Sequence, residues 1–312
     1  MSFVKMDPEK IEVMHRSIAQ WYRRHRRELQ WRKTRDPYHI LVSEIMLQQT
    51  QVNRVKEKLP QFLKRFPSLK VLAHASKADV IRAWSGMGYN NRAIRLRELA
   101  GKVIQDFDGI IPRNIDKLEQ LPGIGQYTSH ALLCFAFGKR VPVVDINIRR
   151  VFSRIFFRMK QPDGLMEIDD CWKLAEKILP RNVYTWNQAL MDIGATICTA
   201  RNPLCGQCPV ADHCASRTIL ERTGLPTKRK MKREPRYNGI PRRIWRGKVV
   251  EVLRNVNGRG SIEMNDIGMA INPGFKKKEL PWIRSVVDAL VNDGIAEMKS
   301  VRSKTTVMLA TG

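Results

Sequence analysis

The 312-residue sequence predicts a mostly α-helical protein, and three observations support that fold class. Apolar side chains recur at three- and four-residue spacing through residues 8–29 and 53–115, the period of amphipathic helices. A glycine turn at residues 121–125 joins two further helical runs, and four cysteines gather within residues 198–214. Strand-like segments occur only near the C-terminus, so we expect a helical body followed by a small mixed domain.

The composition favours a polyanionic partner. The net charge is +26 and the pI is about 10.3, with basic residues concentrated at 23–27 and 228–243. Nucleic acid is the first candidate for such an excess, and a merely basic or ribosome-bound protein is the plainer alternative. No stretch approaches the ~20 apolar residues of a membrane span, and residues 1–10 contain no apolar signal core. We therefore expect an intracellular, nucleoid-associated protein with no membrane contact.

The helix expected across residues 39–52 contains a candidate general acid. Glu44 lies among apolar neighbours that include Val42 and Ile45. Burial penalises the charged form of a carboxyl group and raises its pKa, so such a group holds a proton near neutral pH. The alternative is a glutamate on an exposed helix face, which is the commoner situation for this residue type.

Two glycine-containing turns are candidate DNA contacts. Residues 83–93, AWSGMGYNNRA, place Tyr89 just after two glycines, as a rigid aromatic wedge or as a packed tyrosine in an ordinary turn. Gly123 and Gly125 lie in LPGIG and expose backbone N–H groups at the start of the next helix, which is an anion site or simply part of a helical hairpin. That helix should stop at Gly138.

The cysteine spacing is a specific signal in this chain. It runs Cys198-x6-Cys205-x2-Cys208-x5-Cys214, and four thiolates in so short a span can enclose zinc or an iron–sulfur cluster. Zinc sites usually show two separated Cys-x2-Cys pairs, which this spacing does not match. The two other cysteines, at positions 134 and 171, lie in apolar helical contexts and are expected in the core.

The C-terminal third differs in character from the rest. Residues 222–243 are polar, basic and proline-containing, and they predict a linker. Three helices are expected after it, at residues 244–255, 266–271 and 278–292, followed by a β-hairpin at 295–299 and 305–310. This order resembles a winged helix-turn-helix, which either places its third helix near a DNA groove or serves protein contact alone.

These motifs together resemble the endonuclease III and MutY superfamily of DNA glycosylases. The resemblance rests on the 121–125 turn followed by Asp145, on SEIMLQQTQV at 43–52, on the 83–93 segment and on the cysteine spacing. It covers about residues 8–230, and the larger C-terminal domain of typical MutY enzymes has no counterpart here. It implies a two-lobed helix-hairpin-helix core at 1–221, with a four-iron four-sulfur cluster held by the four cysteines of the 198–214 loop. The linker (222–243) and the winged-helix-like domain (244–312) expected from the tail complete the domain organisation.

The resemblance also implies roles for single residues. Glu44 would protonate the departing base, and Asp145 would stabilise the cationic sugar and guide water to it. Tyr127 stands where endonuclease III has a nucleophilic lysine; tyrosine cannot form a Schiff base, so a monofunctional glycosylase is expected. Asn147 would support the water or a phosphate, with turn capping as the alternative. The expected DNA contacts are Gln48, Gln49, Tyr89, Gly123, Gly125 and Arg32.

The reaction that we predict is removal of adenine from mispairs with 8-oxoguanine or guanine in double-stranded DNA, by a monomeric enzyme. Adenine has an N7 that an acid can protonate, whereas thymine and uracil have none. Mismatch thymine or uracil glycosylases remain the alternative, because TRDPY at 34–38 and IPRN at 111–114 are similar to them. A non-catalytic DNA-binding protein is the second alternative.

Overall fold

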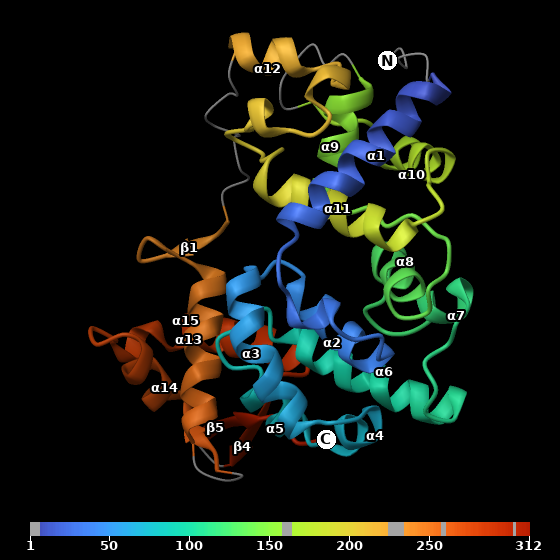
Figure 1. Cartoon of the computed structure of the whole chain (residues 1–312). Coiled ribbons are helices and arrows are strands. Elements are labelled where there is room, and N and C mark those ends of the chain that lie inside the picture. The colour runs from blue at the N-terminus through green and yellow to red at the C-terminus, as the bar shows by residue number, and fades with distance from the viewer. Residues whose placement is uncertain (1–6, 158–163, 224–233, 257–259, 302–303) are drawn as a thin grey trace. The chain divides into compact units, whose positions relative to one another are not determined.

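The protein divides into two compact units. The computed structural model describes residues 7–157, 164–223, 234–256, 260–301 and 304–312, and the predicted mostly helical class is confirmed (Figure 1). Unit 1 comprises the described residues of Met1–Ile40, Arg113–Ile115 and Gly125–Met231. Unit 2 comprises those of Leu41–Pro112, Asp116–Ile124 and Lys232–Gly312. The C-terminal region therefore belongs to the same unit as the helices of residues 41–112. No helix in the described parts of the chain is long and apolar enough to cross a membrane.

Unit 1 is built from helices that pack around α11. Its longer elements are α1 (Pro8–His25), α8 (Gln126–Phe135), α9 (Ile146–Phe156), α10 (Ile168–Lys177), α11 (Val183–Thr196) and α12 (Arg217–Thr223). Short 3-10 turns lie at η1 (Gln30–Arg32), η2 (Cys205–Gln207) and η3 (Ala211–His213). Both α1 and α9 pack against α11, so α11 supports the helix that begins at the candidate residue Asp145.

A buried ion pair ties η1 to α11. The side chain of Asp192 is fully buried, and Arg32 binds it through two hydrogen bonds of 2.8 Å. Arg27 adds a third at 2.6 Å. Burial by itself would raise the pKa of Asp192, but the hydrogen bonds and positive charges of Arg32 and Arg27 outweigh it, and the net pKa is lowered. The pair therefore stabilises the fold with Asp192 charged.

We expect Asp192→Asn to lower the free energy of unfolding by about 3–5 kcal/mol, because the buried guanidinium of Arg32 loses its counter-charge. Since the folded-state pKa of Asp192 is depressed, this stabilisation is present above the unfolded-state pKa of about 3.9 and is lost as the pH falls through the lower folded value. Urea unfolding followed by circular dichroism at pH 7, and at steps below pH 5, measures both effects. Asp212→Asn is the control, because that carboxylate is 89% exposed and its pair with Arg217 is screened by solvent.

The first part of unit 2 is helical and surrounds a large buried aromatic cluster. After α2 (Pro37–Leu47) come α3 (Val52–Arg65), α4 (Leu69–His74), α5 (Lys77–Ala83), α6 (Asn91–Phe107) and the short α7 (Ile115–Glu119). Phe62 and Trp84 meet edge to face with ring centroids 5.6 Å apart, and both side chains are fully buried. The indole N–H of Trp84 donates to the carbonyl of Gly88 (3.1 Å), so this core also holds the loop before α6.

The C-terminal region has the predicted winged-helix-like order. It runs α13 (Arg242–Asn255), β3 (Ile262–Glu263), α14 (Met264–Ile271), η4 (Lys277–Glu279), α15 (Leu280–Asn292), β4 (Ala296–Val301) and β5 (Lys304–Leu309). The antiparallel sheet has the order β3-β5-β4, and Met298 pairs with Val307. The strand β3 escaped the sequence analysis because two residues are too few to show an alternating pattern. The sequence predicts the turn of this hairpin around Arg302-Ser303-Lys304, and the first two of these residues lie outside the described residues.

A further hairpin lies within the stretch predicted as a linker. Strands β1 (Arg236–Tyr237) and β2 (Ile240–Pro241) pair across Asn238-Gly239, and both turn residues have positive φ angles, 47° and 74°. Asn-Gly is the strongest short sequence signal for such a turn, and the surrounding basic residues masked it. Tyr237 stacks on Trp282 of α15 at 3.8 Å, so the hairpin covers the start of that helix. Residues 224–233 of the predicted linker lie outside the described residues.

The winged-helix-like region shares a hydrophobic core with α5 and α6. Trp245, Val249 and Leu253 of α13 belong to one buried cluster with Ile81 of α5 and Ile94 of α6. This apolar face of α13 is therefore covered within the chain.

Candidate active site and cluster-binding loop

Glu44 is a buried carboxyl group in unit 2. Its residue is 5% exposed, and the residues around it in α2 are equally buried, with Val42 at 0% and Ile45 at 4%. Most residues of α2 are apolar and buried, so this helix places the carboxyl group of Glu44 within the protein core.

The helix that carries Glu44 ends earlier than the sequence suggested. We expected one helix through residue 52, but α2 stops at Leu47, and Gln48 and Gln49 lie in a turn where Gln49 has a φ of 56°. Arg92 explains the stop. Its Nη1 donates to the carbonyls of Ile45 (2.9 Å) and Met46 (3.0 Å) and also to that of Gln48, which satisfies the open end of the helix.

Arg92 also holds the loop that carries Tyr89. Its Nη2 donates to the carbonyls of Met87 (3.1 Å) and Gly88 (3.2 Å) and to the hydroxyl of Thr50 (3.0 Å). The residue is 7% exposed, and burial lowers its pKa to about 10. The sequence analysis missed this residue, although it lies within the 83–93 segment. From sequence alone an arginine is expected at the surface, because the buried carbonyl groups that it binds are not visible in the sequence.

Tyr89 projects from a tightly turned loop. Gly86 and Gly88 have φ angles of 77° and 67°, and Tyr89 itself has a φ of 45°, which is unusual for a non-glycine residue. The tyrosine is 52% exposed and is the one aromatic residue among the exposed large apolar residues in the described part of the chain. An ordinary packed tyrosine would be buried, so the exposure favours the wedge interpretation.

The glycine turn between α7 and α8 has the geometry the sequence suggested. Gly123 has a φ of 80°, which favours glycine, whereas Gly125 has an ordinary φ of −114° and is the N-cap of α8. A Cβ on Gly125 would meet nothing within 4 Å, so its side is open. Tyr127 is half-buried in the first turn of α8, and the helix ends at Phe135, three residues before Gly138.

Asp145 caps α9 and is held by two donors. Its Oδ1 accepts from the backbone N–H of Ile148 (2.7 Å), and its Oδ2 accepts from the side-chain amide of Asn147 (2.6 Å). Arg150 in turn donates to Asn147 Oδ1 at 3.0 Å. A Cβ on Gly194 would lie 2.9 Å from the Cβ of Asn147, so α11 approaches α9 closely there. Asn147 therefore orients the carboxylate, and the helix cap is Asp145 itself.

The same helix reaches the cysteine loop at its other end. Arg150 donates to the carbonyl of Cys198 (2.9 Å), and Arg154, one turn further, donates to Cys198 Sγ (3.4 Å) and to the carbonyl of Thr199 (2.7 Å). Burial lowers the pKa of Arg150. The sequence analysis missed both arginines, because their partners lie more than 40 residues away in the chain.

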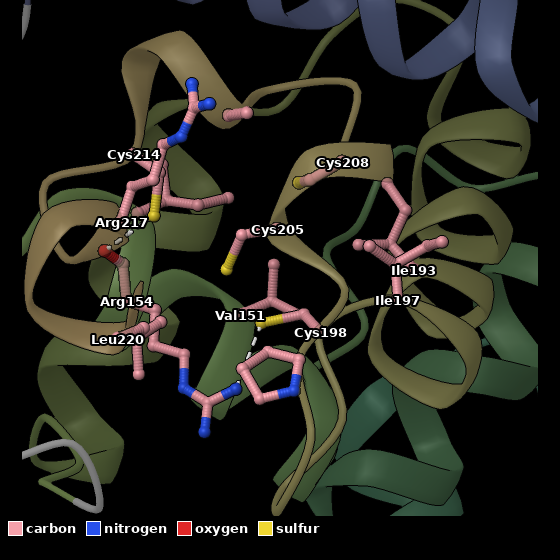
Figure 2. Close-up of a pocket in the computed structure, with 13 residues that line it drawn as sticks. Val151, Arg154, Ile193, Ile197, Cys198, Cys205, Cys208, Cys214, Arg217 and Leu220 are labelled. Carbon is pink, nitrogen blue, oxygen red and sulfur yellow. Dashed lines mark hydrogen bonds between the residues drawn. The ribbon is translucent and has the colours of Figure 1, made fainter. Parts of the chain in front are cut away.

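The four cysteines of residues 198–214 line one cavity, together with apolar side chains such as Val151, Ile193 and Leu220 (Figure 2). Burial raises the pKa of Cys208 to about 12 and that of Cys214 to about 11. Within the described residues no three cysteine, histidine or carboxylate groups converge closely enough for a single metal ion. The four thiols share this one cavity, so the residues present fit the cysteine ligand set of an iron–sulfur cluster. Cys134 and Cys171 are buried core residues, as expected.

Arg32 has a structural position. Its side chain is 8% exposed and is committed to Asp192, so we do not keep it among the proposed DNA contacts. The other predicted site residues fall into both units: Glu44, Gln48, Gln49, Tyr89 and Gly123 in unit 2, and Gly125, Tyr127, Asp145, Asn147 and the four cysteines in unit 1.

Comparison with known families defines the class of protein. Residues 42–177 match the HhH-GPD superfamily of base excision DNA repair proteins, and residues 198–214 match the iron–sulfur binding domain of endonuclease III. The second match begins and ends at a cluster cysteine, and it confirms the predicted iron–sulfur cofactor. The chain belongs to the HhH-GPD superfamily, and DNA is accordingly its partner.

The most similar relatives in this comparison show which family of the superfamily the chain belongs to. The chain is 38% identical to an adenine DNA glycosylase of Mycolicibacterium smegmatis over 284 residues, which is 90% of this chain and 91% of the relative. It is 42% identical to the Mycobacterium tuberculosis adenine DNA glycosylase over 243 residues, 76% of this chain and 77% of that protein. The human adenine DNA glycosylase is 38% identical over 70% of this chain and 42% of its own length. The protein is thus a DNA glycosylase that belongs with the adenine DNA glycosylases.

Solved structures agree on the fold. A thermostable thymine-DNA glycosylase is 34% identical, with a TM-score of 0.63 over 68% of this chain and 98% of that one. An endonuclease III–DNA complex has a TM-score of 0.60 at 22% identity, over 70% of this chain and all of that chain, and shows the fold alone.

The extent of the resemblance needs one correction. We expected it to end near residue 230, but the match to the M. smegmatis protein covers 90% of the chain and so extends past that point. The C-terminal region is shared, at least in part, with that relative.

Proposed function

We propose that this glycosylase removes adenine from mispairs in double-stranded DNA, with 8-oxoguanine or guanine opposite, and that it does so as a monomer. The main observation that supports this proposal is the different surroundings of two carboxyl groups. Two carboxyl groups lie in opposite environments: Glu44 is buried in an apolar helix, whereas the half-exposed Asp145 accepts hydrogen bonds on both of its oxygens. A neutral acid and a charged carboxylate are the pair that hydrolysis of a glycosidic bond requires.

Glu44 supplies the proton. Adenine is a poor leaving group as an anion, and protonation at N7 lets it depart neutral. In this proposal the carboxyl group of the buried Glu44 transfers its proton to N7 of the base. As the C1′–N9 bond breaks, both bonding electrons go to the base, and the sugar becomes an oxocarbenium-like cation.

Asp145 stabilises that cation and receives a proton from the attacking water. Its carboxylate is fixed by Ile148 N–H and by the amide of Asn147, so little reorganisation is needed as positive charge develops. Water adds to C1′ and leaves an abasic site. Tyr127 offers no amine that could form a Schiff base, so strand cleavage should be weak.

DNA contacts are proposed at two kinds of position. Tyr89 enters the base stack as a wedge, next to Gln48 and Gln49 on the turn after α2. The N–H that follows Gly123 belongs to Ile124 and already donates to the carbonyl of Leu121 (3.2 Å). The phosphate is therefore proposed to bind the backbone N–H groups that follow Gly125 at the start of α8, where the helix dipole favours an anion.

Cys198, Cys205, Cys208 and Cys214 are proposed to ligate a four-iron four-sulfur cluster. When bound, the cluster would supply rigid cross-linking of the 198–214 loop. Arg154 donates to Cys198 Sγ and would stabilise that sulfur as a thiolate ligand.

A second candidate is removal of thymine or uracil opposite guanine. The observation that favours it is the 34% identity to a thymine-DNA glycosylase across 98% of that chain.

The test is single-turnover base release from otherwise identical duplexes that contain one A:8-oxoguanine, A:G, T:G or U:G pair. We expect release of adenine from the first two, read as alkali-labile abasic sites. Cleavage at T or U instead would overturn the adenine proposal and support the second candidate. Tight binding with no release from any duplex would point to a non-catalytic DNA-binding protein.

A further inference from the structure

A buried arginine joins the C-terminal region to the loop that carries Tyr89. Arg254 lies in the last turn of α13, and its side chain is 8% exposed. Its Nη2 donates to the side-chain oxygen of Asn90 (2.8 Å), its Nε to the carbonyl of Ile81 (3.1 Å) and its Nη1 to Glu251 (2.8 Å). Burial lowers the pKa of Arg254, so these hydrogen bonds must offset the cost of a desolvated charge.

Asn90 is used in an unexpected way. It is the N-cap of α6, a position where asparagine usually accepts a hydrogen bond from its own helix. Here the side chain makes no such cap and accepts from Arg254 instead. The residue directly after Tyr89 is thus tied to another part of unit 2.

The loop is held from its other side by the helical core. Arg92 donates to the carbonyls of Met87 and Gly88, and the indole N–H of Trp84 donates to Gly88 at 3.1 Å. Between these anchors the loop contains three positive φ angles and presents the exposed ring of Tyr89. A groove of about 480 Å³ runs beside that ring, lined by Asn90 and by α13 residues including Arg243. The loop and α13 therefore form one continuous surface.

We propose that the C-terminal region positions the DNA wedge, and that Arg254 is the positioning residue that does so through Asn90. This inference rests on the proposed role of Tyr89. A loop with strained backbone angles has competing conformations. If the loop must be reordered when DNA binds, both the affinity for DNA and the rate of base opening fall. The shared core of α13 with α5 and α6 makes the anchor firm, because Arg254 continues the buried row of Val250 and Leu253.

The test is a double-mutant cycle with Arg254→Met and Asn90→Ala in the full chain carrying its cluster. Stopped-flow fluorescence of 2-aminopurine beside the mispaired adenine reports base opening, and single-turnover assays report base release. We expect each single variant to slow opening about tenfold, because a charge-assisted hydrogen bond is lost and the wedge is misplaced. The double variant should be no slower than either single variant.

Two further variants separate positioning from folding. Asn90→Asp keeps an acceptor for Arg254 and should retain the opening rate of the parent protein. Lys248→Met removes one positive charge from the same helix. Lys248 contacts the carbonyl of Ile271 and the ring of Trp245, both of which belong to the C-terminal region. This variant should therefore leave the rate of base opening within about twofold of the parent rate. Additive losses in the double variant, or lowered thermal stability with unchanged opening, would overturn the proposal.

Tyr89→Ala distinguishes failure of this inference from failure of the proposed function. If Tyr89→Ala slows opening but Arg254→Met does not, only the positioning role is wrong. If Tyr89→Ala leaves opening unchanged, the wedge role itself is wrong and the inference falls with it.

Discussion

Replacing Asp145 with asparagine will lower single-turnover release of adenine by about 10³-fold or more, while DNA affinity stays within about twofold. Asparagine has nearly the same shape but no charge, so it cannot stabilise the oxocarbenium-like sugar or take a proton from water. Its side-chain oxygen can still accept from the N–H of Ile148, and the cap of α9 is therefore kept. Release is measured by alkaline cleavage, and affinity by fluorescence anisotropy on the same A:8-oxoguanine duplex.

Asp7→Asn is the matched control for Asp145→Asn. Asp7 is also an N-cap aspartate, and it accepts from Glu9 N–H at 3.0 Å at the start of α1. This variant should release adenine at the parent rate. Residual activity of Asp145→Asn near the parent rate would show that another group carries the charge. A large loss of DNA affinity would mean that Asp145 acts in binding instead.

Replacing Glu44 with glutamine will reduce release of adenine by about 10²–10⁴-fold, the usual contribution of general acid catalysis. Glutamine fills the same buried space but cannot deliver a proton to N7. The parent enzyme should lose a similar factor on 7-deazaadenine, which has no N7. The release rate of Glu44→Gln should be little lower on 7-deazaadenine than on adenine, because the proton transfer that N7 would accept is already absent in this variant. The measurement is single-turnover release for both proteins on both substrates.

The control for Glu44→Gln is Glu57→Gln on α3, where the glutamate side chain is 56% exposed and pairs only with Lys58. Its rate should match the parent rate. A strictly multiplicative loss for Glu44→Gln on 7-deazaadenine would contradict proton transfer to N7. That result would assign Glu44 a role in holding the base instead.

Much of the candidate site could be predicted because its signals are local. The cysteine spacing lies within 17 residues, and the glycine turn, the SEIMLQQTQV segment and the wedge segment are each shorter. Backbone geometry at Gly123 follows from residue type alone, since glycine reaches a φ of 80° without steric cost. The hairpin at Asn238-Gly239 was predictable on the same ground, and only the neighbouring charges hid it.

The partners of the buried arginines could not be predicted. Arg32 meets Asp192 across 160 residues of sequence, and Arg254 meets Asn90 across 164. In each case an arginine of a basic sequence becomes a buried structural residue. The early end of α2 has the same origin, because Arg92 on another helix donates to the carbonyls of Ile45 and Met46 in its last turn.

Residue type and spacing within short segments predicted the helical class and the winged-helix-like order of the C-terminal region. The resemblance to a known family, carried by short motifs of the same sequence, predicted the iron–sulfur loop and the two candidate carboxyl groups. Only the tertiary structure decided that Arg32 is a structural residue, that Asn147 orients Asp145 and that the C-terminal region packs on α5 and α6 beside the Tyr89 loop. The physical reason is that a buried charge or amide is defined by the partners that compensate its desolvation, and those partners come from distant parts of the chain.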